Sequence, residues 1–451
     1  PGLDGLQRAI AASGGVTLRR VDGTVADTAG QPSPGARVHV TSLDGTRYLD
    51  RVTADATGRF GVHVPAGPVR LVAWRSGSAP TAAVEVAGDA SEAALVFPLD
   101  GSIAVEATDA LSGEGLPVRV QVIPVGASPR SLPASHGEPA TQSGRLHVAY
   151  PTDGRVTLPA PPGVYRVVVS RGPFYDLSDT RVTVAAGMTA RVPVTLRRVV
   201  TTPGVLCGDF HVHTIRSPDS DDDARLKLAA GVADDLSVMA RSDHEWVMDF
   251  QPLIEEMGLT RYVRGVGSIE MTTFTFGHFG VFPLNPDPSR HNNGDFAWAN
   301  RLPSAVFADV RARPERPTLV INHPRGAPPA AYFDAAGYSA ADGTANPAMW
   351  DEGFTAVEFF NGSSFEQNAT LVTDWFSFLR RGRRVFAVGS SDSHHLSASP
   401  VGYPRTCMFL GTSDPSTVSP QAIGTAVGAG RSTISGGIFL DVRALPATGE
   451  A

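Results

Sequence analysis

The residues of this chain that are best suited to chemistry are histidines and carboxylates that follow short apolar segments. The segment GDFHVHTIRSPDSDDD, which begins at Gly208, places His211 and His213 two residues apart behind an apolar run. Residues i and i+2 of a β-strand point to the same face, so Asp209, His211 and His213 would share one face. Such spacing belongs either to an ordinary strand that carries polar residues or to a pair of imidazole ligands for a metal ion.

The same pattern recurs along residues 211–395, which contain eight of the twelve histidines. The residues that end these apolar segments are His211 and His213, His244, Glu270 with His278 just beyond it, His323, and Asp392 with His394. If they converge, polar atoms would stay unpaired and carboxylates would repel each other unless cations bind them. We therefore expect divalent metal ions, and imidazole and carboxylate ligands without thiolate suit Zn, Mn or Fe(II).

The apolar segments predict the elements that must position these residues. Segments typical of strands, such as LSVMARSDH, PTLVINHP and RVFAVGSSDSH, alternate with segments typical of helices at about 221–235, 245–257, 303–312 and 365–381. That alternation predicts a parallel sheet, and about six or seven strand–helix units are enough to close a barrel. In β/α barrels the functional residues lie at the carboxyl ends of the strands, which is where the polar residues lie here.

The N-terminal part has a different pattern. Residues 1–15 form a lead-in segment, and residues 16–101 and 102–199 each contain short alternating strands separated by turns rich in Gly, Pro and Asp. TGRFGVHVPAGPVRLVAW, which begins at Thr57, aligns with DGRVTLPAPPGVYRVVVS, which begins at Asp153, and their Gly-Arg pairs are 96 residues apart. A repeat of this length predicts two small β-sandwiches, module 1 (16–101) and module 2 (102–199).

These modules resemble a known class of domain. The phrase GQPSPGARVHV…TGRFGVHVPAG is similar to the transthyretin-like or carboxypeptidase-regulatory-like modules that occur on exported bacterial proteins. His39, His63, His136 and His147 lie in the two modules, and we interpret them as structural residues of strands and surfaces.

Composition limits the classes of function. A chain of 451 residues that is 42% hydrophobic and 18% charged is long enough for several globular domains. Its formal net charge of -7 disfavours a nucleic-acid partner, and it has no apolar run long enough to cross a bilayer. Lys227 is the single lysine among 38 basic residues, a skew from which no function follows.

Two further features bear on location. The chain opens on Pro1 without Met, and we expect it to derive from a longer or processed precursor, in which a removed signal peptide would no longer be visible. Cys207 and Cys407 are the only cysteines, and they are either two buried thiols or a disulfide, which would require an oxidising compartment. Together with the modules, this favours an exported protein, periplasmic or secreted.

The order of motifs DFHVH…SDH…GSIE…GH…NHPR…SSDSH resembles the PHP (polymerase and histidinol phosphatase) superfamily. Within it, SIEMTTFTFGHFGVFPL, INHPRG, VEFFNG and AVGSSDSHH…VGYPRT are similar to the carbaryl-hydrolase branch, the CehA/McbA-type metallohydrolases. The resemblance covers about residues 205–435. It implies that residues 200–445 form a distorted (β/α)7 barrel that holds two or three divalent metal ions.

The resemblance also implies roles for individual residues. The implied metal ligands are His211, His213 and Asp392 at the first ion, Glu270 between the first and second, His278 and His323 at the second, and His244, His394 and Asp219 at the third. The third position departs most from the family. The family often uses a further histidine or an acid from the loop after the two histidines, and here Asp219 takes that place. Asp209 would accept a hydrogen bond from a ligand imidazole and so orient it.

Two more residues are candidates for catalysis. Arg325 in NHPRG either meets a phosphate or a developing oxyanion, or forms a salt bridge at the rim of the barrel. His291 in the loop NPDPSRHNNGD either donates a proton or is an ordinary loop residue, and the same alternatives hold for His395.

These features predict a metal-dependent hydrolase that cleaves an ester-type bond in a small molecule, with a hydroxide that bridges two metal ions as the nucleophile. The bond is a phosphoester, or a carboxylic or carbamate ester. Arginines that converge on the metals would favour phosphate, and an aromatic pocket would favour an aryl ester. The aromatic candidates are Trp246, Phe274, Phe276, Trp298, Phe359 and Phe360. The alternative is a non-catalytic, metal-stabilised binding module on an exported protein, and the negative net charge disfavours a nuclease.

Overall fold

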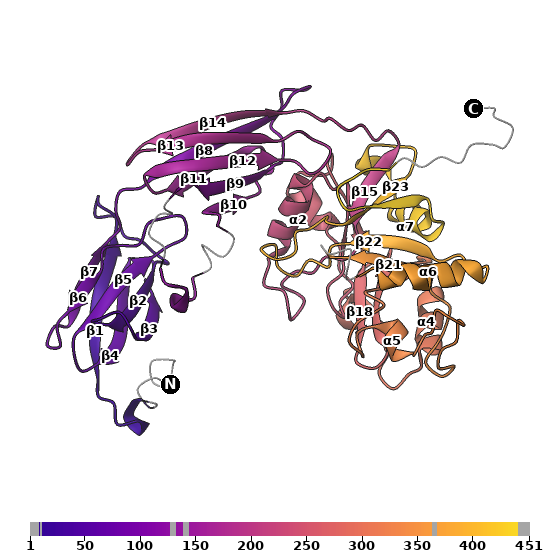
Figure 1. Cartoon of the computed structure of the whole chain (residues 1–451), viewed down its shortest axis with the longest axis horizontal. Helices are drawn as coiled ribbons and strands as arrows, with labels where there is room; N and C mark the ends of the chain where they lie inside the picture. The colour runs from indigo at the N-terminus through magenta and orange to yellow at the C-terminus, as the bar shows by residue number, and fades with distance from the viewer. Residues whose placement is uncertain (1–8, 10, 127–131, 139–143, 363–367, 441–451) are drawn as a thin grey trace.

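In a computed structural model of the protein, residues 9, 11–126, 132–138, 144–362 and 368–440 are described. Most of the expected lead-in segment therefore lies outside the described residues. Module 2 lies between module 1 and the C-terminal part, which begins near residue 200, and the three parts form an arch (Figure 1).

Module 1 is a sandwich of a four-stranded and a three-stranded sheet, with the strand orders β3–β2–β5–β6 and β4–β1–β7. Its strands are β1 (Leu18–Ala26), β2 (Arg37–Ser42), β3 (Tyr48–Thr53), β4 (Arg59–Pro65), β5 (Val69–Trp74), β6 (Val84–Val86) and β7 (Glu92–Val96). Alternate residues of β4 and β5 are buried, as the period-two pattern of the sequence predicts. Their side chains join those of β2 in one hydrophobic core between the sheets.

Module 2 repeats the arrangement of module 1. Its strands are β8 (Gly101–Asp109), β9 (Arg119–Pro124), β10 (His147–Ala149), β11 (Arg155–Ala160), β12 (Gly163–Ser170), β13 (Ser178–Val184) and β14 (Thr189–Leu196). Just as β1 pairs antiparallel with β4 and parallel with β7, β8 pairs antiparallel with β11 and parallel with β14. The repeat in the sequence therefore corresponds to two β-sandwiches of one topology.

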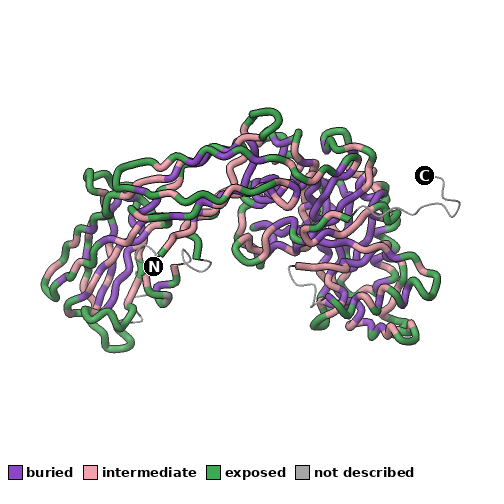
Figure 2. Tube along the Cα trace, turned by 45° about the horizontal axis from the view of Figure 1, so that its top comes forward, coloured by how far each residue is buried: buried purple, intermediate pink, exposed green. Residues whose placement is uncertain are grey.

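The C-terminal part contains two five-stranded sheets, with the orders β17–β16–β15–β23–β24 and β18–β19–β20–β21–β22. Their strands are β15 (Val205–Asp209), β16 (Val238–Arg241), β17 (Arg264–Gly267), β18 (Ile269–Thr273), β19 (Gly277–Phe282), β20 (Thr318–Ile321), β21 (Ala356–Asn361), β22 (Phe386–Ser390), β23 (Arg405–Phe409) and β24 (Ser432–Ser435). The helices are α2 (Ala224–Ala233), α3 (Gln251–Glu256), α4 (Pro303–Arg311), α5 (Tyr332–Ala335), α6 (Thr370–Arg380) and α7 (Pro420–Gly428). Buried segments are more continuous in this part than in the modules, where they alternate with exposed residues (Figure 2).

The predicted (β/α)7 barrel is wrong. Within the described residues neither sheet closes on itself, and both mix parallel with antiparallel pairs, for example β15 with β16 and β15 with β23. The prediction failed because residues 274–276 alone separate β18 from β19, which is too short for the crossover that parallel strands require. The motif around Glu270 and His278 is therefore an antiparallel hairpin. With six sheets in its described residues, the chain is a mostly β, multidomain protein.

The predicted helices correspond to α2, α3, α4 and α6, each of which begins at or after the predicted start. The start of the segment expected at 365–381 lies outside the described residues, since 363–367 are not described. The sequence reasoning missed α5 and α7, and also the strands β19, β23 and β24. Among the described residues, no helix is both long and apolar enough to cross a bilayer.

Covalent and polar contacts fix the start of the C-terminal part. Cys207 and Cys407 are directly paired residues of β15 and β23 and form a disulfide. Arg171, which follows β12, is buried, donates to the backbone oxygen of Val232 and forms an ion pair with Asp235. Module 2 is thus attached to the C-terminal part by contacts as well as by the chain.

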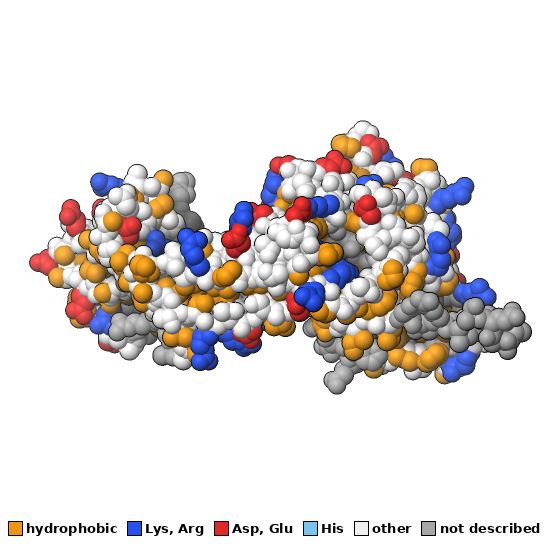
Figure 3. Space-filling view, turned by 90° about the horizontal axis from the view of Figure 1, so that it is seen from above, with side chains coloured by type: hydrophobic (Ala, Val, Ile, Leu, Met, Phe, Trp, Pro, Cys, Tyr) orange, Lys and Arg blue, Asp and Glu red, His pale blue; other side chains and the backbone are white. Residues whose placement is uncertain are grey.

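Acidic and basic side chains are interspersed on the face shown in Figure 3.

Candidate metal centre

The strand ends of the two sheets bring the predicted ligands together. His211 and His213 follow β15, His244 follows β16, and Glu270 lies in β18. Glu270 pairs with Gly280 of the antiparallel strand β19, and His278, two residues earlier in β19, places its Nδ1 3.6 Å from Oε1 of Glu270. His323 follows β20, and Asp392 and His394 follow β22. Two isolated bridges join the sheets at this point, His244 with Glu270 and Val212 with Ser393.

All nine predicted ligands belong to groups whose ligand atoms lie within 4.8 Å of one another. Three inner groups are His211, His323 and Asp392; His211, His213 and Glu270; and Glu270, His278 and His323. The outer group is His213, Asp219, His244 and His394. Every group has at least one buried member, and Asp219 is the most exposed of the nine, with a side chain that is 54% exposed. The side chains of His323, Asp392 and His394 are 21–25% exposed.

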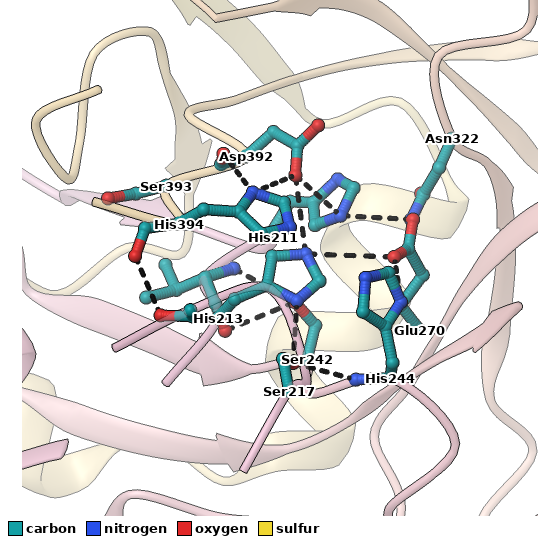
Figure 4. A network of polar contacts seen from close by, with 12 residues as sticks. His211, His213, Ser217, Ser242, His244, Glu270, Asn322, Asp392, Ser393 and His394 are labelled. Carbon is teal, nitrogen blue, oxygen red and sulfur yellow. Dashed lines mark hydrogen bonds and ion pairs between the residues drawn. The ribbon is translucent and has the colours of Figure 1, made fainter. Parts of the chain in front are cut away.

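Glu270 and Asp392 are the carboxylates at the middle of the centre (Figure 4). Oε1 of Glu270 lies 3.1 Å from Nε2 of His211 and 3.2 Å from Nε2 of His323, and its Oε2 lies 2.8 Å from Nδ1 of His244. Oδ1 of Asp392 lies 3.2 Å from Nε2 of both His211 and His213. Each carboxylate thus faces several imidazoles at a separation that suits shared ligation.

Asp219 makes the equivalent contacts in the outer group. Its Oδ2 lies 3.2 Å from Nε2 of His244 and 3.1 Å from Nε2 of His394. Asp219 therefore stands where the sequence reasoning placed it, beside the two histidines of the third predicted position.

The tautomers of the first two histidines test whether a cation fits. Nδ1 of His211 lies 2.9 Å from Oε1 of Glu358, to which it donates. Nδ1 of His213 lies 2.9 Å from Oγ of Ser217, and that hydroxyl donates to Asp243, so it accepts from the imidazole. Each Nε2 is then left with a lone pair that faces Oδ1 of Asp392.

These facing lone pairs are unpartnered. Nε2 of His211, Nε2 of His213, Nδ1 of His278 and Oδ1 of Asp392 are buried and have no hydrogen-bond partner. Buried polar atoms are nearly always paired, so four such atoms in one place call for something that binds them all. A divalent cation does so, and the donor set of imidazoles and carboxylates fits Zn, Mn or Fe.

The carboxylates and imidazoles of the centre interact strongly. Burial acts to lower the pKa of His211 and His244, but the surrounding carboxylates outweigh it and raise both, that of His244 to about 9. Burial acts to raise the pKa of the Glu270 carboxyl, but the adjacent imidazoles of His211, His244 and His278 outweigh it and hold that pKa well below its usual value. Burial lowers the pKa of His213 to about 4, which keeps its imidazole neutral at physiological pH. An ionised carboxylate and a neutral imidazole are the protonation states in which these groups ligate metals.

Sequence reasoning missed two residues that support the ligands. Glu358, in the motif VEFFNG, is buried and accepts from His211 and from the backbone amide of His323. Asn322 donates to Oε1 of Glu270. The signal for Glu358 was an acidic residue within an otherwise apolar strand segment, which requires a specific partner when it is buried.

Asp209 does not orient an imidazole as expected. Its carboxylate accepts from the backbone amides of His211, Ser391 and Gly402. It therefore braces the two backbone segments that carry ligands and does not contact a ligand ring.

The two candidate catalytic residues point elsewhere. Arg325 donates two hydrogen bonds to Asp374, at 2.7 and 2.9 Å, and one to Asp334 at 2.7 Å. His291 is 80% exposed and pairs with Asp295. Of the two alternatives for Arg325, the geometry favours the salt bridge, and His291 is placed as a loop residue.

Three aromatic side chains are linked to the residues that follow His244 in the sequence. Glu245, which follows His244, accepts from the indole of Trp298, and Trp298 packs edge-on against Phe274 with ring centroids 5.3 Å apart. Phe274 is 74% exposed. The guanidinium carbon of Arg216 lies over the ring of Trp246, 3.3 Å from its centroid. We call Trp246, Phe274 and Trp298 the aromatic rim. Of the other aromatic candidates, Phe276 is in the core and Phe359 packs on Trp375.

Comparison with known proteins assigns only the N-terminal part. Residues 20–99 match the carboxypeptidase regulatory-like domain, so the chain carries a domain of this kind at its N-terminal end and the resemblance noted for module 1 is confirmed. The chain matches none of the curated proteins with which it was compared. The resemblance of the C-terminal part to the PHP superfamily stays a prediction.

Solved structures similar to the chain include proteins of Gram-positive bacteria. The Bacillus anthracis TIE protein is 14% identical over 40% of this chain and 35% of that chain, with a TM-score of 0.19. A streptococcal ancillary pilin is 15% identical over 40% of this chain and 62% of that chain, with a TM-score of 0.24. The shaft pilin SpaA of Lactobacillus rhamnosus GG is 10% identical over 42% of this chain and 100% of that chain, with a TM-score of 0.26. The chain thus spans about a third of the first and under two thirds of the second. At these TM-scores the similarity carries no argument about function.

Proposed function

We propose that the C-terminal part is a metal-dependent hydrolase that cleaves ester-type bonds of small molecules. The observation that carries the proposal is the convergence of nine ligand residues around buried, unpartnered nitrogen and oxygen atoms. The order of motifs, which resembles the PHP superfamily and its carbaryl-hydrolase branch, supports the same conclusion. The proposal does not depend on a barrel, because function resides in the site and not in the fold that presents it.

The inner groups would hold two divalent ions and the outer group a third. Bound divalent ions supply an activated water and polarise the oxygen of the bond to be cleaved. Glu358 and Ser217 prepare the site by fixing the tautomers of His211 and His213, so that each imidazole presents Nε2. Asp219, the most exposed of the proposed ligands, marks the side from which a substrate enters.

The charges around the centre favour an uncharged ester over a phosphoester. Arg325 is committed to Asp374 and Asp334, and Arg241 to Asp243. Arg216 lies on Trp246, within the aromatic rim. A phosphoester site is expected to aim guanidinium groups at the metals. A carboxylic or carbamate ester with an aromatic group needs an apolar surface beside the metals, which the rim supplies.

The test combines metal analysis with a substrate panel. Purified protein is loaded with Zn or Mn, its metal content is measured, and p-nitrophenyl acetate, a naphthyl carbamate, p-nitrophenyl phosphate and bis-p-nitrophenyl phosphate are offered. We expect bound metal and turnover of the acetate or carbamate. His323→Ala and Asp392→Ala should lose metal and turnover together, because each removes a ligand of an inner group.

His291→Ala and His395→Ala are matched controls, since each removes an imidazole that is paired outside the centre. They should keep the metal content and the turnover of the unaltered protein. Turnover of the phosphoesters alone would reverse the choice of ester. Bound metal without turnover of any substrate would instead support the non-catalytic binding module.

We also propose that the protein works outside the cytoplasm. The disulfide between Cys207 and Cys407 supports this, because disulfides persist in oxidising compartments and are rare in the cytosol. The carboxypeptidase regulatory-like domain agrees with it. Thiol titration of the unfolded protein, isolated without reductant from its native host, should find no free thiol, and two free thiols would contradict the proposal.

A further inference from the structure

Lys227 is the single lysine among the 38 basic residues of the chain, and it is fully buried. It lies in the first turn of α2 and belongs to none of the groups of proposed ligand residues. A chain that uses arginine everywhere else has a lysine at one position, and that position has no access to solvent. The contacts of its ammonium group explain why this position has a lysine and not an arginine.

Nζ of Lys227 has three acceptors. It lies 3.0 Å from Oδ2 of Asp222, 2.9 Å from the backbone oxygen of Ser393 and 2.7 Å from Oγ of Ser393. An ammonium group has three N–H donors on one atom, so all of them are used. A guanidinium group presents its donors in a planar fork and could not bring three acceptors to one point.

These acceptors belong to two loops that are far apart in sequence. The first loop, 214–223, contains Asp219 and Asp222, and the second, 391–399, contains Ser393 and His394. Asp219 and His394 are two of the four members of the outer group. Lys227 therefore ties together the two loops that must both be in place to form that group.

Other hydrogen bonds also connect these two loops. Oγ of Ser220 donates to the backbone oxygen of His394 at 2.6 Å, and the backbone amide of Leu396 donates to Oδ2 of Asp222 at 2.7 Å. The backbone oxygen of Ser393 also accepts from the amide of His213, a third member of the outer group. Ser393 and its neighbours are shown in Figure 4.

Burial of an ammonium group costs several kcal/mol unless a charge partner and hydrogen bonds compensate for it. Here Asp222 and Ser393 compensate, and the result is a rigid junction in place of two independent loops. A metal ligand contributes most to affinity when its position is already fixed before the ion binds.

We propose that Lys227 is a positioning residue for the outer cation, which holds the loop of Asp219 and the loop of His394 in one register. The proposal rests on the metal centre proposed above. It predicts that loss of the ammonium group weakens one cation position and spares the position formed by ligands outside both loops, namely Glu270 in β18, His278 in β19 and His323 after β20.

The test is a calorimetric titration of the full, metal-free chain with Zn²⁺ or Mn²⁺. Lys227→Met keeps the length of the side chain and removes all its donors. We expect it to weaken one class of bound cation by about tenfold or more, the usual cost of removing a group that supports a ligand, and to leave the other class unchanged. Lys227→Arg should fail to rescue it. Arg225→Met, an exposed basic residue of the same helix, is the matched control and should bind as the unaltered protein does.

Asp219→Asn identifies the affected class, because it removes a ligand of the outer group directly. The double variant Lys227→Met/Asp219→Asn should lose no more cation affinity than Asp219→Asn alone. Equal affinities in Lys227→Met and the unaltered protein, equal loss from both classes, or additive losses in the double variant would each overturn the inference.

Two further measurements keep the result decisive. If Lys227→Met does not fold, as judged by near-UV circular dichroism, Ser393→Ala removes one acceptor and should weaken the same class of cation to a smaller extent. An unaltered protein that binds no cation would overturn the proposed function and this inference together. An unaltered protein that binds cations, with variants that behave like it, would overturn this inference alone.

Discussion

Replacement of Arg325 distinguishes a structural from a catalytic role. The guanidinium group makes two hydrogen bonds to Asp374, one to Asp334 and one to the backbone oxygen of Tyr338, all between 2.7 and 2.9 Å. The side chain of Asp374 is only 5% exposed. Arg325→Met keeps much of the aliphatic packing and leaves that carboxylate buried without its cation.

The size of the effect follows from these contacts. Removal of one partner of a buried ion pair destabilises a protein by about 3–5 kcal/mol. Because the side chain of Arg325 is 22% exposed, we expect the lower end, about 3 kcal/mol. In Arg325→Met/Asp374→Asn no charge is left unpaired at this pair, so the double variant should lose less stability than the sum of the single variants.

Urea denaturation followed by tryptophan fluorescence measures the stability, and turnover of the substrate found in the panel is measured on folded protein. We expect a lower midpoint and unchanged kcat/KM. A fall in kcat/KM of about a hundredfold or more, with the midpoint unchanged, is the size expected for loss of a group that stabilises an oxyanion and would refute the structural assignment.

Three other predictions follow from the described contacts. Reduction of the Cys207–Cys407 disulfide, which closes a loop of 200 residues, should destabilise the C-terminal part by about 5 kcal/mol in the chain-entropy account, and unchanged denaturation with and without reductant would contradict it. Phe274→Ala should raise KM for a naphthyl ester and leave KM for an acetate of a small alcohol unchanged, because only the former reaches the aromatic rim; equal effects on both esters would argue against a binding role. Burial, with the nearby charges of His136, Arg51 and Arg37, lowers the pKa of His39 to about 4. Below about pH 6.5 the His39 imidazole therefore binds a proton in the unfolded chain but stays neutral in the folded protein. Stability should therefore fall as the pH falls from about 6.5 to 4, and His39→Gln should lack this part of the fall when thermal unfolding is compared across that range.

Much of the candidate site could be predicted because its signals are local. His211 and His213 are two residues apart in an extended segment, and most of the other proposed ligands end apolar runs, so chain geometry aims these at one edge. Asp219 lies in a polar loop and was assigned from the family resemblance. The same reasoning predicted the β-sandwich modules, where alternation and turn residues recur at a fixed interval. Local geometry says which face a side chain occupies.

Local geometry does not say which segments pair or in which direction. The hairpin of β18 and β19 has the same apolar segments as two parallel strands would have, and only the three-residue connection excludes the predicted barrel. For the same reason the sequence left open whether Cys207 and Cys407 pair, since 200 residues separate them.

The sequence by itself determined which residue types end the strands, and so the ligand chemistry that is available. The tertiary structure alone decided what each polar group outside the ligand set contacts. Glu358 holds a histidine 147 residues away, Arg325 is bound by an aspartate 49 residues away, and Lys227 holds a serine 166 residues away. A charged group that loses its water needs a partner, and the partner comes from whichever segment the fold places beside it, a choice that no local pattern records.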